Sequence, residues 1–156
     1  MNPFEIMRDG FIITSWMWGL FSIKHWLADY LFQTDWMVRN KGRYFSLGGW
    51  VHALIHGTGS IPIWVVLFWM VPMEIGPGRI LGWIGFAFGI EVLLRHMNDY
   101  LETNLIQRAS GPWYWRLIGF NQLADSLIYV GLGMYWWSLI WSEFPHMNLK
   151  MAGLTP

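Results

Sequence analysis

The longest uncharged stretch of the chain is YFSLGGWVHALIHGTGSIPIWVVLFWMVPM, residues 44–73. Its thirty residues hold no Asp, Glu, Lys or Arg. A helix needs only about 20 mostly apolar residues to cross a bilayer. The stretch therefore predicts a transmembrane helix over residues 49–73. Pro62 falls inside it, which a membrane helix tolerates when its neighbours satisfy the freed backbone groups.

Three further segments of the chain are apolar enough to predict helices. Residues 11–34 hold few charges, residues 117–142 hold only Asp125, and residues 80–106 are apolar in their first half. Charged residues make up 13% of the chain, about half the share in a soluble domain. We therefore predict an all-α fold, an integral membrane four-helix bundle with short loops, that forms a single domain over residues 1–156.

Composition also limits the partners of the chain. Its formal net charge is zero, so no basic surplus predicts nucleic-acid binding. It has no cysteine, which excludes disulfides and thiolate metal sites. Its 13 Trp residues favour membrane interfaces. The predicted partner is membrane lipid, and assembly into a homo-oligomer or a larger membrane complex stays open.

The basic residues predict an orientation. With four spans, the 35–48 and 107–116 loops share one side of the membrane. That side holds Arg39, Lys41, Arg43, Arg108 and Arg116. The other side holds Arg8, Arg79 and Lys150. Because positively charged loops stay inside, this excess predicts a multi-pass membrane protein with both termini outside the cytoplasm.

Ionisable side chains gather near one end of the predicted helices. They are His25, Asp29, His52, His56, Glu91, Arg95, His96, Asp99, Glu102 and Asp125. Burying such a group in a bilayer costs roughly 2.5–3.5 kcal/mol, so each needs a partner or a role. The ends of the first and third helices and the starts of the second and fourth all lie on the same side of the membrane. We therefore expect one polar layer, on the order of 10–15 Å deep, at the cytoplasmic face.

Imidazole and carboxylate groups together are typical ligands of zinc, iron and manganese. The His25-x3-Asp29 and His52-x3-His56 spacings each place two such groups one helical turn apart. The predicted metal ligands are His25, Asp29, His52, His56, His96 and Asp99, and the candidate catalytic residues are Asp125 and Glu102. The predicted cofactor is a divalent metal ion, zinc before iron or manganese. A metal-activated water would make the protein a hydrolase of a lipid or lipid-linked phosphate.

Two other interpretations of the polar layer stay open. It could hold the helices together through hydrogen bonds in a non-enzymatic accessory or scaffold subunit of a larger complex. Alternatively, His25, His56 or His96 could be an axial ligand of haem or chlorophyll. The i, i+4 spacing of Glu91 and Arg95 is most simply an ion pair. Arg39, Lys41 and Arg43 are also candidates to hold an anionic head group.

The segment HWLADYLFQTDWMVRNK, residues 25–41, resembles a family of small bacterial and phage membrane proteins catalogued as domain of unknown function 3307. HALIH at 52–56 and HMNDY at 96–100 look like its next two motifs, and the match covers about residues 20–130. The chain departs from the family at Glu102, where Lys is usual, and at Asp125, where His is usual. The resemblance implies a bacterial or phage protein, and with it a place in the bacterial inner (cytoplasmic) membrane, but no particular activity.

Overall fold

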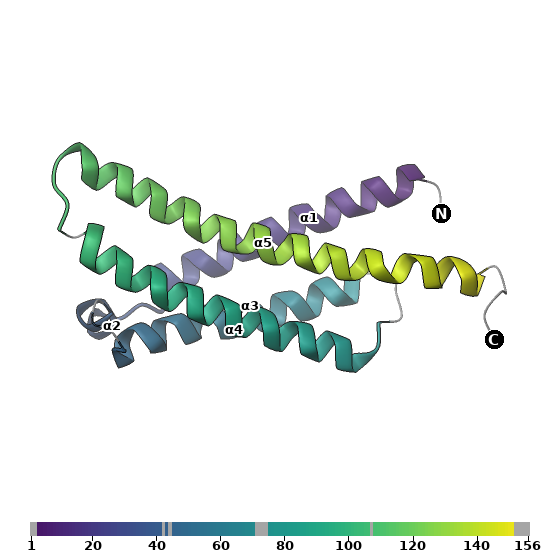
Figure 1. Ribbon diagram of the computed structural model, residues 1–156, viewed down its shortest axis with the longest axis horizontal. Coiled ribbons are helices and arrows are strands. Elements are labelled where there is room, and N and C mark those ends of the chain that lie inside the picture. The colour runs from purple at the N-terminus through teal and green to yellow at the C-terminus, as the bar shows by residue number, and fades with distance from the viewer. Residues whose placement is uncertain (1–2, 42, 44, 71–74, 107, 152–156) are drawn as a thin grey trace.

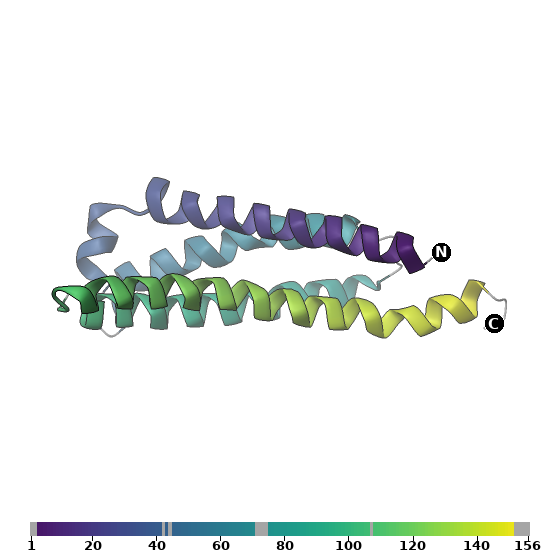
Figure 2. The same cartoon turned by 90° about the horizontal axis from the view of Figure 1, so that it is seen from above.

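Four long helices form an elongated bundle (Figures 1 and 2). They are α1 (Pro3–Trp26), α3 (Leu47–Met70), α4 (Pro77–Leu101) and α5 (Pro112–Met151). The computed structural model describes residues 3–41, 43, 45–70, 75–106 and 108–151. None of these residues is in a strand. The predicted all-α fold is confirmed.

Short helical segments complete the bundle. The π-helix η1 (Leu27–Leu31) directly follows α1, the six-residue helix α2 (Asp35–Asn40) comes before α3, and the π-helix η2 (Glu102–Ile106) continues α4. Thr34 caps α2, because its hydroxyl accepts a hydrogen bond from the Met37 amide at 3.4 Å. The first predicted helix therefore ends near residue 31 instead of 34, and the predicted 35–48 loop contains a helix. Residues 71–73, the end of the second predicted span, lie outside the described residues.

Three helical stretches of the described chain are long and apolar enough to cross a membrane. They are Leu47–Met70, Pro77–Ile106 and Pro112–Ser142. They correspond to the second, third and fourth predicted spans. The first predicted span is not among them, although α1 packs along α3 and α5. A membrane crossing by α1 stays a prediction.

An apolar core fills the half of the bundle away from the polar layer. Trp64, Leu67 and Trp136 are almost fully buried there. Trp83 is buried beside Trp64, with the two ring centres 5.2 Å apart. The prediction that tryptophans mark the membrane interface is therefore wrong for these three rings, which supply core volume instead.

Helices α3 and α4 form the most extensive helix contact among the described residues, and Gly57 allows a close approach there. A Cβ atom added at Gly57 would lie 2.6 Å from Val92 Cγ2 and 3.0 Å from the Phe88 ring. Val92 is buried and cannot easily move aside. Small residues at such contacts are typical of packed membrane helices.

We expect Gly57→Ala to destabilise the bundle by about 1–3 kcal/mol, the usual effect of overpacking a core. Gly85→Ala is the matched control, because no atom lies within 4 Å of a Cβ added at Gly85. That variant should gain stability, up to about 1 kcal/mol, from helix propensity alone. Thermal unfolding in detergent measures both. Equal melting temperatures for the two variants would contradict the close helix contact.

Candidate metal centre

Three potential metal-ligand atoms converge between η1 and α3. The Asp29 Oδ1 atom lies 2.9 Å from His56 Nε2 and 3.1 Å from His52 Nε2, and the two imidazole nitrogens are 3.3 Å apart. Both histidines are buried, whereas the Asp29 side chain is 24% exposed. The structure therefore brings three of the six predicted ligands into one group.

The local structure of each element explains this convergence. The two histidines are four residues apart on α3, so their rings lie on one face of the helix. Asp29 lies in the π-helix η1, a wider turn than the α-helix that precedes it. Single π-turns associated with α-helices are frequent at functional sites.

The spacing of the three atoms suits a small cation. Ligands about 2.0–2.2 Å from a tetrahedral zinc ion lie roughly 3.3–3.6 Å from one another. The separation of 3.3 Å between the two imidazole nitrogens lies at the lower limit of this range, and the separations of 2.9 and 3.1 Å to Asp29 are a few tenths of an ångström shorter. A slight opening of the group would seat an ion among Asp29, His52 and His56.

When the His52 ring is neutral, its hydrogen bonds leave the ring nitrogen that faces this group without a proton. Its Nδ1 donates to Asp99 Oδ2 at 2.7 Å, because a carboxylate accepts. The neutral ring then has a lone pair on Nε2, and that lone pair faces the Asp29 carboxylate. Two acceptors in contact repel unless a cation, either a proton or a metal ion, lies between them. Asp99 thus has the position of a carboxylate that orients a metal-bound histidine.

His25 holds Asp29 and is not itself a member of the group. Arg95 Nη2 lies 3.1 Å from His25 Nδ1, and a guanidinium can only donate. The proton of neutral His25 is therefore on Nε2, which donates to Asp29 Oδ2 at 3.0 Å. His25 fixes the carboxylate whose other oxygen joins the histidines of α3.

His96 is not brought to the group. Its ring stacks on Trp50, with ring centres 4.2 Å apart and planes within 14°. Its Nδ1 has no hydrogen-bond partner among the described residues. Of the six predicted ligands, three converge, His25 and Asp99 bond to them, and His96 lies apart.

The two predicted catalytic residues are both engaged in ion pairs. Asp125 accepts hydrogen bonds from Arg95 Nη1 and Asn98 Nδ2, each at 2.6 Å. Glu102 accepts one from Lys41 at 2.9 Å. Neither carboxylate belongs to the group of three converging atoms, and a catalytic role for either stays a prediction. Lys41 is buried in this pair, which removes it from the predicted head-group contacts.

A second polar cluster, which we call the deep cluster, lies next to the candidate centre. It consists of Lys24, Ser60, Glu91 and Tyr129, all of them buried. Lys24 Nζ donates to Glu91, to the Tyr129 hydroxyl at 2.7 Å and to the His56 carbonyl at 3.2 Å. Glu91 also accepts from Ser60 and from Tyr129. The predicted pairing of Glu91 with Arg95 is wrong, because Glu91 pairs with Lys24 and Arg95 with Asp125.

The surroundings of the histidines bear on the haem interpretation. His25 and His56 both contact the Asp29 carboxylate, and His25 also contacts Arg95. These charged neighbours do not form the apolar wall that suits a porphyrin.

No protein-family model matches the chain, and no curated protein and no solved structure matches it either.

Proposed function

We propose that the protein is an integral membrane protein that binds one divalent metal ion, zinc before iron or manganese, through Asp29, His52 and His56. We further propose that the ion serves the hydrolysis of a lipid or lipid-linked substrate. Three protein ligands are the number found at catalytic zinc sites, where the fourth position takes water or substrate. Such an ion would supply a water that ionises near neutral pH.

The charge balance of the polar network supports a divalent cation most directly. Three of its carboxylates are matched by cations in the pairs Lys24–Glu91, Arg95–Asp125 and Lys41–Glu102. Asp29 and Asp99 add two further negative charges, on opposite sides of His52. With neutral histidines, the described network thus carries three positive and five negative charges, a net −2. One divalent ion at the candidate centre would neutralise it, and buried charge in a bilayer demands such compensation.

A purely structural function is the second candidate, and one observation favours it. His52 lies between two carboxylates, 2.7 Å from Asp99 and 3.1 Å from Asp29. A doubly protonated imidazole would donate to both and would neutralise half of the excess charge without a metal ion. The polar layer would then hold helices together in an accessory subunit.

Histidine substitutions separate these two functions. We expect His52→Ala to lose the metal ion that the parent protein binds, because it removes a direct ligand. His96→Ala is the matched control, since it removes an imidazole that lies apart from the group, and it should keep the ion. Metal content per chain, measured by mass spectrometry after purification in detergent, gives the answer. Equal metal content in both variants would contradict the ligand assignment.

The proposed topology places both termini outside the cytoplasm. The five basic residues on the 35–48 and 107–116 loops, against three on the other side, support it. We expect Ser110→Cys to react with an impermeant thiol reagent only after the cells are opened. Gly78→Cys should react in intact cells, provided that the reagent can pass the outer membrane. The parent chain has no cysteine, so any labelling of the chain comes from the introduced residue. The reverse pattern would invert the topology without affecting the candidate centre.

A further inference from the structure

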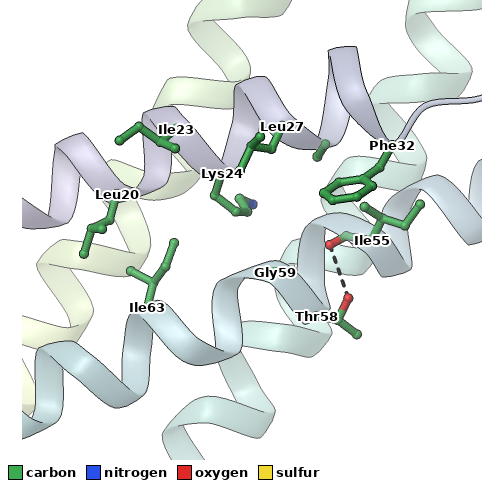
Figure 3. Close-up of a pocket in the computed structure, with 10 residues that line it drawn as sticks. Leu20, Ile23, Lys24, Leu27, Phe32, Ile55, Thr58, Gly59 and Ile63 are labelled. Atoms are coloured by element: carbon green, nitrogen blue, oxygen red, sulfur yellow. Dashed lines mark hydrogen bonds between the residues drawn. The ribbon is translucent and has the colours of Figure 1, made fainter.

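An apolar groove runs between the α1–η1 segment and α3. Its volume is about 590 Å³. In Figure 3, Leu20 and Ile63 face each other near one end of the groove, and Phe32 and Ile55 near the other. Ligand sites in proteins usually have volumes of about 300–1,000 Å³. The groove is therefore large enough for a ligand of its own.

The polar atoms at the groove wall are already bonded within the protein. Lys24 contributes its methylene stem, which lies on Gly59, while its ammonium group is turned into the deep cluster. The Thr58 hydroxyl donates to the carbonyls of Leu54 and Ile55. The remaining side chains of the wall are aliphatic or aromatic. Such a surface offers little to a sugar or a phosphate and suits a hydrocarbon chain.

The groove also has the length and direction of a lipid chain. From Leu20 to Phe32 the wall follows twelve helical steps, which span at most about 18 Å at the α-helical rise of 1.5 Å per residue. One leaflet of a bilayer has a hydrocarbon thickness of about 15 Å, half of the 30 Å core. Ile23 and Phe32 on the groove wall are more than half exposed, so lipid chains can reach it from the side.

The groove and the candidate metal centre share the same two elements. Ala28 of the groove wall precedes Asp29 in η1, and Ile55 precedes His56 in α3. Phe32, at one end of the groove, is followed by Gln33, whose amide nitrogen lies 3.4 Å from His52 Nε2. A chain lying in the groove would therefore end beside the polar layer.

We infer that this groove binds one acyl chain of a membrane lipid, whose head group then lies at the polar layer beside Asp29. The inference deepens the proposed function, on which it rests, by naming an acyl lipid as the substrate class. Substrate would enter from the bilayer and not from water.

Photo-crosslinking tests the inference on the full chain in detergent micelles. The probe is a phosphatidylglycerol with a diazirine midway along one acyl chain, and peptide mass spectrometry locates the adducts. We expect adducts concentrated on residues 20–32 and 55–63. Ile23→Trp and Thr58→Trp, which fill the groove from opposite walls, should each reduce them at least about five-fold. Leu123→Trp, an equally bulky change at an exposed position on α5, should leave them unchanged.

Two results would overturn the inference and leave only general lipid contact. One is that adducts spread equally over the exposed faces of α4 and α5. The other is that the number of adducts is unchanged in both groove variants. Metal content measured on the same samples keeps the two proposals distinguishable. Groove adducts in a protein that binds no metal ion would contradict the proposed function alone. A bound metal ion with scattered adducts would contradict the groove alone.

Discussion

Replacing Asp29 by Asn is expected to lower the affinity of the candidate centre for zinc at least about 100-fold, more than the usual loss of an outer-shell partner. Asparagine keeps the volume of the side chain and one acceptor oxygen for His25 Nε2. It removes the negative charge that offsets a divalent ion and weakens the one oxygen ligand of the group. The helices should stay folded, because an uncharged side chain is easier to bury in a bilayer.

Asp35→Asn is the matched control for this variant. It makes the same substitution six residues along the chain, at the exposed first residue of α2. We expect it to bind zinc like the parent protein. Zinc titration in detergent, followed by thermal unfolding of each sample, measures both properties. If Asp29→Asn binds zinc as tightly as the parent, Asp29 is not a ligand. If Asp29→Asn is more stable than the parent and neither of these two proteins binds zinc, the structural function is favoured.

Replacing Lys24 by Met is expected to destabilise the bundle by about 3–5 kcal/mol, the usual cost of removing one partner of a buried ion pair. Glu91 would remain buried with only hydroxyl donors, those of Ser60 and Tyr129. The Tyr129 hydroxyl and the His56 carbonyl would each lose a donor as well. Chemical or thermal unfolding in detergent measures the loss.

The double variant Lys24→Met with Glu91→Gln should recover most of that stability, because it removes the uncompensated charge along with the cation. The Lys24→Met variant and the double variant should both bind zinc like the parent, since neither changes a proposed metal ligand. Should the double variant be as unstable as the sum of the two single variants, Lys24 and Glu91 would not be coupled. The ion pair assigned to the deep cluster would then be wrong.

The fold was predictable because hydropathy and helix length are properties of the sequence itself. The helices near 49–73, 80–106 and 117–142 follow from runs of apolar residues, and the structure has helices over the described parts of these ranges. The break after Leu31 was not predictable in the same way. It depends on the π-turn of η1 and on the Thr34 cap, which are local backbone choices that an apolar pattern does not encode.

The depth at which the candidate centre lies was predictable, but the set of side chains that form it was not. Position along a helix determines how deep a side chain lies, so the layer containing Asp29, His52 and His56 could be predicted. The rotation of one helix against another decides which side chains meet, and no single helix encodes that rotation. His96 therefore stacks on Trp50 instead of joining the group.

The pairing of charges in and around the deep cluster also depends on how the helices pack, which the sequence of one helix does not encode. Glu91 and Arg95 have the right spacing for a pair on α4, yet each finds its partner on another helix, Lys24 of α1 and Asp125 of α5. Lys24 itself carried a signal, because a lysine within an apolar helix requires an anionic partner. Which carboxylate takes that place depends on helix packing.

The metal content of the parent protein tests the central claim most directly. The protein is purified in detergent, dialysed against a defined excess of zinc and then against metal-free buffer, and analysed by mass spectrometry for zinc, iron and manganese. We predict one tightly bound divalent ion per chain, released by acid because the histidine ligands must lose their protons to bind it. Less than a tenth of an ion per chain, for every metal tested, would contradict the metal centre at Asp29, His52 and His56.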